Sequence, residues 1–169
     1  MSSRLPVEID PESLVEKRSE LRGVLPLSGF ARLSESLVVD QGGAEVIVSF
    51  RKDGDLKIIS GHVSATLSVR CQRCLEPVHL LVDRNFRLAL VYSDEQAKRL
   101  PAIYDPLLLE NRHIVFSDII EDELILAIPD IPGHDDCQPE QLVFADEEFE
   151  TKAEPNPFAI LAKLKSKEN

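Results

Sequence analysis

The chain has 169 residues and a formal net charge of −11, which suit one domain with a sizeable core and a tail. It lacks Trp and has few other aromatic residues, so the core is expected to be mainly aliphatic. No apolar run approaches the roughly 20 residues that span a bilayer, and the N-terminus has no signal-peptide pattern. Three cysteines, an odd number, favour a reducing compartment over a disulfide framework. These features predict a soluble cytoplasmic protein.

The negative charge is concentrated in one segment. Residues 113–151 contain twelve Asp or Glu and no Lys or Arg. Lys and Arg are the side chains that neutralise phosphates, so this composition argues against non-specific nucleic-acid binding through a broad basic surface. An acidic block is usually a solvated surface, and a surface that binds a basic partner is the alternative.

The N-terminal part of the chain is expected to hold short elements. Residues 5–9 are a strand candidate. Residues 11–20 are predicted to form a helix, because Asp10 suits the N-cap and Pro11 the first helical position. Glycine and proline interrupt the sequence that follows, which leaves room for a short helix at 29–37.

The middle of the chain is predicted to form a β-sheet. Residues 44–50, 56–71 and 78–92 alternate between apolar and polar side chains and are rich in β-branched residues. The Asp-Gly pair at 53–54 is a typical hairpin turn. The two longer segments are separated by few residues, so they are expected to pair antiparallel. Gly61, inside the first of them, is predicted to mark a bulge.

Further helices and one strand are expected after the long hairpin. Residues 93–100 predict a short helix, and residues 106–110 predict a strand. Residues 117–128 have the clearest helical pattern, with Ser117 as a candidate N-cap and acids in the first turn. Residues 157–165 form the last predicted helix and carry an apolar stripe followed by lysines.

Together these elements predict an α+β fold. We expect an antiparallel β-sheet of about five or six strands around a long central hairpin, packed with a few helices whose apolar stripes need a sheet face. A single domain is predicted at 1–130, an acidic loop or partly disordered segment at 131–156, and a C-terminal tail helix at 157–169.

Cys71 and Cys74 lie at the tip of the predicted hairpin. A structural zinc ion takes four tetrahedral ligands from Cys and His, and a Cys-x-x-Cys pair on a tight turn supplies two of them. His134 and Cys137 have the same spacing in the loop after the long helix and could supply the other two. The spacing therefore predicts a Cys3His zinc site. Against it, Leu75 follows the second cysteine, where zinc knuckles normally have a small residue.

Two other interpretations of the cysteines remain open. A redox pair needs its first cysteine at a helix N-terminus, where the helix dipole lowers the thiol pKa, but here the pair lies between two predicted strands. The thiols could also pack as small apolar groups at the end of the hairpin. Zinc ligation and packed thiols are therefore the two main alternatives.

No catalytic motif accompanies the cysteines. The chain has no GxSxG motif, no HExxH motif and no glycine-rich phosphate loop. His62, His79 and His113 stand alone in the sequence, and the Glu-Asp-Glu run at 121–123 is expected to be a solvated helix face favoured by the helix dipole. The sequence therefore predicts that the protein is not an enzyme.

Several short motifs follow one another along the chain: CQRCLEPV, SDEQAKRLP, YDPL, EDELILAIP, HDDC and the terminal NPFAILAKLK. In this order they resemble the YceD-type large ribosomal RNA subunit accumulation proteins of bacteria and plastids. The resemblance extends from about Leu5 to Lys165, and the family's cysteines match Cys71, Cys74 and Cys137. The cysteine hairpin, the acidic helix and the tail are its most specific parts.

The resemblance implies a non-enzymatic ribosome-biogenesis factor that supports accumulation or processing of large-subunit (23S) ribosomal RNA. Because the net charge disfavours RNA clamping, we expect a protein partner: a basic ribosomal protein or an rRNA-processing factor, within pre-large-subunit particles. The acidic segment is the predicted docking surface. A second predicted contact, which could instead pack on its own domain, is the apolar stripe of the tail: Phe158, Ile160, Leu161 and Leu164.

An RNA-binding module is the alternative function. Four arginines on or beside the two long strands could form a local basic patch near the cysteines: Arg70, Arg73, Arg84 and Arg87. RNA binding through phosphates would weaken steeply with salt, and no measurable RNA binding at low salt would remove this alternative.

Overall fold

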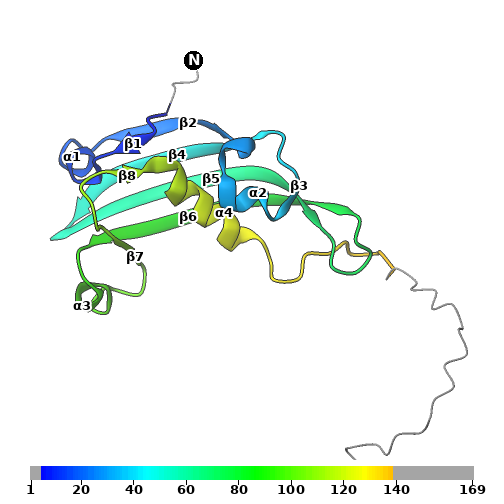
Figure 1. Cartoon of the computed structure of the whole chain (residues 1–169). Coiled ribbons are helices and arrows are strands. Elements are labelled where there is room, and N and C mark those ends of the chain that lie inside the picture. The colour runs from blue at the N-terminus through cyan, green and yellow to red at the C-terminus, as the bar shows by residue number, and fades with distance from the viewer. Residues whose placement is uncertain (1–4, 139–169) are drawn as a thin grey trace, which may run out of the picture.

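The computed structural model of the chain describes residues 5–138, which form a six-stranded mixed sheet, a separate two-stranded ribbon and several short helices (Figure 1). In chain order the elements are β1 (Glu8–Ile9), α1 (Pro11–Glu16), β2 (Glu20–Pro26), the 3-10 helix η1 (Leu27–Gly29), α2 (Ala31–Ser34), β3 (Leu37–Val39), β4 (Gly43–Asp53), β5 (Leu56–Arg70), β6 (Pro77–Val91), α3 (Asp94–Ala97), β7 (Asp105–Leu108), β8 (Ile114–Val115) and α4 (Phe116–Ala127). The predicted α+β class is confirmed.

The long hairpin dominates the sheet. Strands β5 and β6 have 15 residues each and pair without a break from Ile58–Ala89 to Arg70–Pro77. At about 3.3 Å per residue, each strand is roughly 50 Å long. The tip of this hairpin therefore lies at one end of the sheet, and the turn between β4 and β5 lies at the other (Figure 1).

The prediction of an all-antiparallel sheet is wrong at one pair. The strand order is β2-β4-β5-β6-β7, with β3 also paired to β5, and β7 runs parallel to β6. A parallel pair needs a crossover of about a dozen residues, which residues 92–104 supply. This crossover packs Leu100 and Tyr104 against Ile58 and Ala89.

The helix predicted at 11–20 is too long. The helix ends at Glu16, and Arg18 adopts a left-handed conformation with φ 49°, which turns the chain into β2. Strand β2 pairs with β4 and alternates between half-buried and exposed residues. Its Gly23 and Pro26 were expected to interrupt the chain, but an edge strand tolerates both residues.

The later helices agree better with their predictions. Helix α4 covers the predicted 117–128 within one residue, although its N-cap position is Val115 and no side chain caps it. Ser93 caps α3 through its side chain. The single helix predicted at 29–37 is instead divided among η1, α2 and β3.

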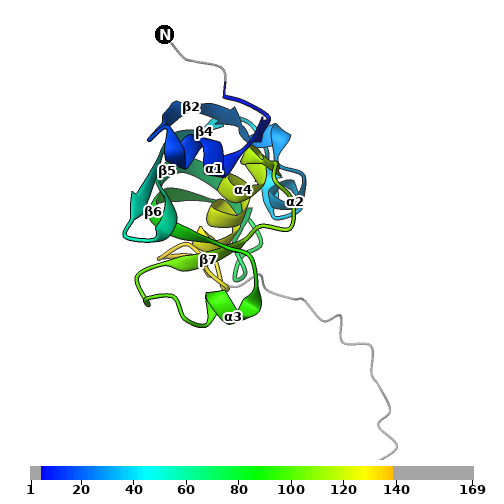
Figure 2. The same ribbon diagram turned by 90° about the vertical axis from the view of Figure 1, so that its left-hand side faces the viewer.

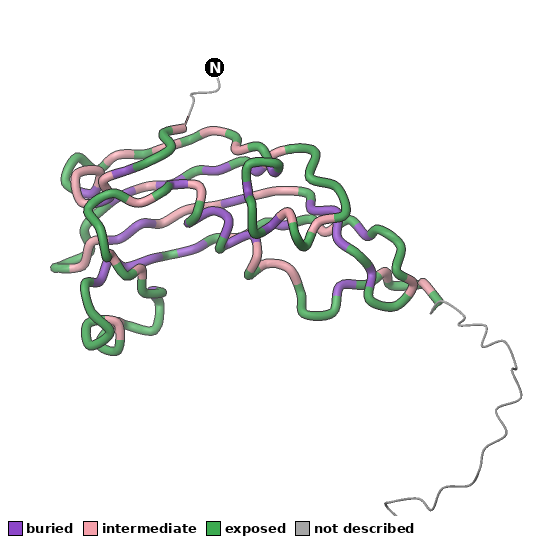
Figure 3. Tube along the Cα trace, viewed as in Figure 1, coloured by how far each residue is buried: buried purple, intermediate pink, exposed green. Residues whose placement is uncertain are grey.

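The core lies between one face of the sheet and helices α1, α2 and α4, which all cover that face (Figure 2). Buried residues follow the strands and the helix faces turned toward them, whereas most loop residues are exposed (Figure 3). The core is mainly aliphatic, as predicted. Within residues 5–138, no helix is long and apolar enough to cross a membrane.

The bulge predicted at Gly61 is wrong. Gly61 pairs with Phe86 in an uninterrupted ladder. A Cβ atom at position 61 would lie 2.2 Å from Cζ of Phe86. Glycine is required here because the aromatic ring lies directly over the backbone of the neighbouring strand.

Candidate metal centre

The turn between β5 and β6 gathers two of the three cysteines. The backbone N–H of Cys71 donates to the carbonyl of Glu76 at 2.9 Å, and the N–H of Leu75 donates to the carbonyl of Cys71 at 3.1 Å. Leu75 adopts the left-handed conformation with φ 63°, which costs a non-glycine residue roughly 1–2 kcal/mol. This conformation explains why zinc knuckles normally have a small residue after the second cysteine. Here Leu75 adopts the same conformation.

The segment after α4 returns to this turn. The N–H of Gln72 donates to the carbonyl of Pro132 at 2.8 Å. A Cβ atom on Gly133 would lie 3.9 Å from Sγ of Cys71, an ordinary contact. The described part of the predicted acidic loop, residues 131–138, therefore lies against the hairpin tip.

The four predicted zinc ligands meet here. The donor atoms of Cys71, Cys74, His134 and Cys137 all lie within 4.8 Å of one another. Sγ of Cys71 is 3.6 Å from Sγ of Cys137, and Sγ of Cys74 is 3.4 Å from Nδ1 of His134. Sulfur ligands about 2.3 Å from a tetrahedral zinc ion lie about 3.8 Å apart. These two separations therefore fit edges of a zinc tetrahedron.

His134 is oriented for ligation through Nδ1. Its Nε2 lies 3.1 Å from the carbonyl oxygen of Pro77. A carbonyl can only accept, so Nε2 carries the proton and Nδ1 presents its lone pair to the thiols. Metal-binding histidines commonly have their second nitrogen fixed in this way.

Arg73, between the two cysteines of the turn, holds the returning segment. Its Nε donates to Sγ of Cys137 at 2.9 Å, and one Nη donates to the carbonyls of His134 and Asp135, the latter at 3.1 Å. Its backbone N–H also donates to Sγ of Cys71 at 3.4 Å. Arg73 is one of the four arginines predicted to contact RNA, and no sequence pattern indicates its contact with Cys137.

The electrostatics favour the thiolate at Cys71 and Cys137 but not at Cys74, where a backbone hydrogen bond from Glu76 lowers the pKa and burial with the neighbouring sulfur atoms raises it more. Hydrogen bonding from the backbone of Cys74 lowers the pKa of the Cys71 thiol to about 5. Burial raises the pKa of the Cys137 thiol, but hydrogen bonds from Arg73, His134 and Cys74 together outweigh it and the net pKa is lowered. The neighbouring sulfur atoms of Cys71 and Cys137 raise the pKa of His134. Thiolate is the form that binds metal, so the site is chemically suited to a cation such as zinc.

The structure does not bring the four predicted RNA-contact arginines into one patch. Arg84 lies on the helix-covered face and pairs with Glu123 at 2.7 Å. Arg70 and Arg87 lie on the opposite face, but Arg87 pairs across the ladder with Ser60. Ser60 is ten residues from Arg70 along β5, which is about 33 Å.

The expectation of a solvated acidic face at 121–123 is wrong. Glu121 and Glu123 are each only 4% exposed. Glu123 pairs with Arg84, and Arg32 pairs with Glu121 and Asp122. These arginines lie far away in the sequence, so no local pattern revealed the pairs.

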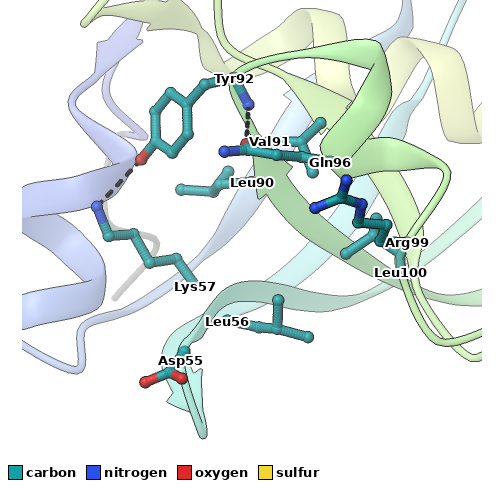
Figure 4. Close-up of a pocket in the computed structure, with 9 residues that line it drawn as sticks. All are labelled: Asp55, Leu56, Lys57, Leu90, Val91, Tyr92, Gln96, Arg99 and Leu100. Atoms are coloured by element: carbon teal, nitrogen blue, oxygen red, sulfur yellow. Dashed lines mark hydrogen bonds between the residues drawn. The ribbon is translucent and has the colours of Figure 1, made fainter.

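Lys57, Tyr92 and Gln96, at the other end of the sheet, are joined by hydrogen bonds. A cavity of about 300 Å³ lies there between β5, the end of β6 and α3 (Figure 4). Nζ of Lys57 lies 3.0 Å from the Tyr92 hydroxyl and also contacts Glu12, while the Tyr92 N–H donates to Oε1 of Gln96 at 2.8 Å. These contacts join α1, the sheet and α3, and they indicate a structural role.

Two predicted partner-binding features cannot be placed. The tail residues Phe158, Ile160, Leu161 and Leu164 lie outside the described residues. The same holds for positions 139–151 of the acidic segment.

A family comparison and a curated relative give the same description. The sequence pattern of the family described as "Large ribosomal RNA subunit accumulation protein YceD" matches residues 59–165, from β5 through both halves of the cysteine-histidine cluster to the tail. A protein of that name from Haemophilus influenzae is 35% identical over 170 residues, which cover 97% of this chain and 98% of the relative. No solved structure matches the chain. The chain therefore belongs to the YceD family of large ribosomal RNA subunit accumulation proteins.

Proposed function

We propose that this chain supports accumulation of large-subunit (23S) ribosomal RNA as a non-enzymatic factor that acts in the cytoplasm by binding a basic protein of pre-large-subunit particles. The family description supports the role in accumulation of large-subunit RNA. The net charge of −11 supports a partner that is basic. The observation that carries the proposal is the cluster that joins the hairpin tip to the acidic segment: Cys71, Cys74, His134 and Cys137.

Zinc is the cofactor that we propose for this cluster. Three thiols and one imidazole are the donor set of a structural zinc site, and Nδ1 of His134 already faces the sulfur atoms. Four protein ligands leave no open position for a reactive water, in keeping with a non-enzymatic role. Zinc would fasten residues 131–138 to the sheet and so determine where the predicted acidic loop at 131–156 starts.

The exposed acids of residues 113–138 are the proposed docking surface. Residues 113–138 contain seven acidic side chains, of which Glu121, Asp122 and Glu123 are paired with arginines. The remaining acids are exposed and form no salt bridge within the described part of the chain: Asp118, Asp130, Asp135 and Asp136. With positions 139–151, they would attract a basic surface. The tail stripe at 158–164 is the second proposed contact.

A complementation experiment tests the proposal. In cells that lack the native protein, Cys74→Ser should fail to restore the ratio of 23S to 16S ribosomal RNA, because serine is a poor zinc ligand. Gln72→Ser, in the same turn but outside the ligand set, should restore it. Normal 23S RNA in the cells without the protein would refute the function. A fully active Cys74→Ser variant that contains no zinc would show that the function does not require zinc.

Direct RNA binding is the second candidate. Of the four arginines, only Arg70 and Arg87 form no salt bridge or side-chain hydrogen bond within residues 5–138. Filter binding of the purified protein to 23S fragments at low salt measures this activity. Tight binding that falls steeply with salt would support RNA contact, and no binding at low salt would remove it.

A further inference from the structure

A groove on the covered side of the sheet lies between β7 and the start of α4. It encloses about 340 Å³, and β7 lies below α4 in the view of Figure 2. Leu107 and Leu108 of β7 form one side, Ile119 of α4 and Ile114 of β8 add apolar surface, and Asp118 lies on the α4 side. The groove therefore has an apolar interior and an acidic helix on one side.

The apolar surface of the groove is accessible. Leu108 is 45% exposed and Val115 is 36% exposed, and both line the groove. Strand β7 is the last strand of the sheet, so its outer edge faces no other strand within the described chain. Exposed apolar side chains beside an open strand edge are typical of a site where another polypeptide binds.

The acidic side of the groove has a regular spacing. Asp118 and Asp122 are one helical turn apart on α4, so their Cβ atoms lie about 6 Å apart. Glu110 adds a third carboxylate at the loop after β7. Asp122 is shared with Arg32, but neither Asp118 nor Glu110 forms a salt bridge within residues 5–138.

On the α4 side, the Arg32 guanidinium pairs with Asp122 at 2.6 Å and donates to the Asp118 carbonyl at 3.4 Å, so the carboxylates of Asp118 and Glu110 are the ones left without a cation among the described residues. The lining includes His113 but neither Lys nor Arg. Arg112, next to His113, is paired with Asp10 at 2.9 Å. The groove therefore attracts cationic side chains and repels phosphates, which excludes RNA as its occupant.

We propose that this groove binds an extended basic-apolar-basic segment, Lys or Arg on either side of an aliphatic residue, in the basic partner protein. In an extended chain, alternate side chains lie about 6.6–6.8 Å apart on one side, close to the spacing of the two α4 carboxylates. The residue between them points to the opposite side, where Leu107 of β7 lies. The inference rests on the proposed function for the existence of a basic partner, and it adds the docking site and the sequence that docks.

A peptide titration tests the inference directly. The probe is an amidated nine-residue peptide with a central Lys-Leu-Lys, added to the ¹⁵N-labelled full chain. We expect amide shift changes concentrated at residues 107–122 and an affinity that falls with added salt. Peptides with Glu-Leu-Glu or Lys-Gly-Lys at the centre should bind at least tenfold more weakly. Equal binding of either control peptide, or shift changes elsewhere, would overturn the inference.

Matched variants locate the charge contacts. The double variant Glu110→Gln with Asp118→Asn should weaken binding of the Lys-Leu-Lys peptide about tenfold, as expected for two partly exposed ion pairs. The control Asp94→Asn with Glu95→Gln removes the same charge from α3, outside the groove, and should change the affinity less than twofold. An equal loss of peptide affinity in the two double variants would mean that the net charge of the protein explains the binding. That result would refute specific binding in the groove.

The chain's own tail is the competing occupant, since residues 163–165 read Lys-Leu-Lys. Lys163→Glu with Lys165→Glu in the full chain should leave the peptide affinity unchanged. A large increase would assign the groove to the tail and overturn the inference of a partner. These measurements use purified protein, so a negative result would refute the docking site without refuting the proposed role in ribosomal RNA accumulation. Conversely, peptide binding with normal 23S RNA in cells without the protein would refute only the proposed function.

Discussion

The Glu121 carboxylate accepts the backbone N–H of Leu33 at 2.9 Å, so a side chain of α4 caps the short helix α2. The same carboxylate accepts the backbone N–H of Arg32 at 2.7 Å and its Nε at 3.0 Å. The N-cap residue of α2, Phe30, has no side chain able to do this. The helix therefore depends on a residue 88 positions away for the hydrogen bonds that usually come from its own N-cap.

Replacing this carboxylate should destabilise the fold. Glu121→Gln keeps the shape but removes the charge and places an amide N–H₂ against backbone donors, so we expect a loss of about 2–3 kcal/mol in the free energy of unfolding. The neighbouring Asp122→Asn removes an exposed ion pair with Arg32 and should cost less than about 1 kcal/mol. Urea unfolding followed by circular dichroism measures both. Equal losses would contradict the capping role of Glu121.

Glu121 should also make the stability depend on pH. Burial raises the pKa of this carboxyl, but hydrogen bonds from Leu33 and Arg32 outweigh burial and hold the net pKa below its ordinary value. Its contribution is therefore complete above the pKa of the unfolded chain and is lost as the pH falls through the lower folded pKa. Unfolding free energies at pH 7, 5 and 3 should fall less steeply in Glu121→Gln than in the natural chain. If the unfolding free energies of the two proteins fell equally with pH, Glu121 would not contribute to the pH dependence.

Protein purified without a His tag should contain one zinc ion per chain. Cys71→Ser should remove most of the metal, whereas Gln72→Ser should keep it, because only the former changes a donor atom. Elemental analysis by mass spectrometry gives the stoichiometry. A strong chelator should lower the melting temperature of the natural chain, and it should have little effect on Cys71→Ser. Metal-free natural protein that also fails to take up added zinc would instead favour packed thiols.

Arg73 should strengthen zinc binding without being a ligand. Arg73→Gln removes the contacts with Sγ of Cys137 and with the carbonyls of the returning segment, so zinc should bind about tenfold more weakly. Arg70→Gln, an arginine at the end of β5 without such contacts, is the matched control and should change nothing. Competition with a chromogenic chelator measures both. Equal affinities would mean that Arg73 does not support the site.

Gly61→Ala should disrupt the contact between the central strands. The added methyl group would meet the ring of Phe86, and overpacking of this kind costs typically 1–3 kcal/mol. Gly29→Ala adds a methyl group with an ordinary contact at 3.7 Å and serves as the control. Combining Gly61→Ala with Phe86→Leu should cost less than the sum of the two single changes, as thermal unfolding can show. Strict additivity would argue against a direct clash.

The helices are predicted only in part because an apolar stripe must repeat over several turns before it indicates a helix. Helix α4 is long enough for an apolar stripe to repeat, and it was predicted within one residue. Helix α1 stops after six residues because Arg18 turns left-handed, and the following Leu21 then belongs to a strand rather than to the helix stripe. Short elements give too few repeats to separate a helical from a strand period, so the neighbouring β4 decides which one forms.

By itself, the sequence determined the long hairpin, the placement of Cys71 and Cys74 at its tip, and a second pair with ligand spacing. Each depends on alternation or spacing within a short stretch, which the chain carries locally. Only the tertiary structure decided that β7 runs parallel to β6, that Glu121 is buried and that Arg73 holds Cys137. These features join residues between 17 and 89 positions apart, so packing of the whole chain determines them.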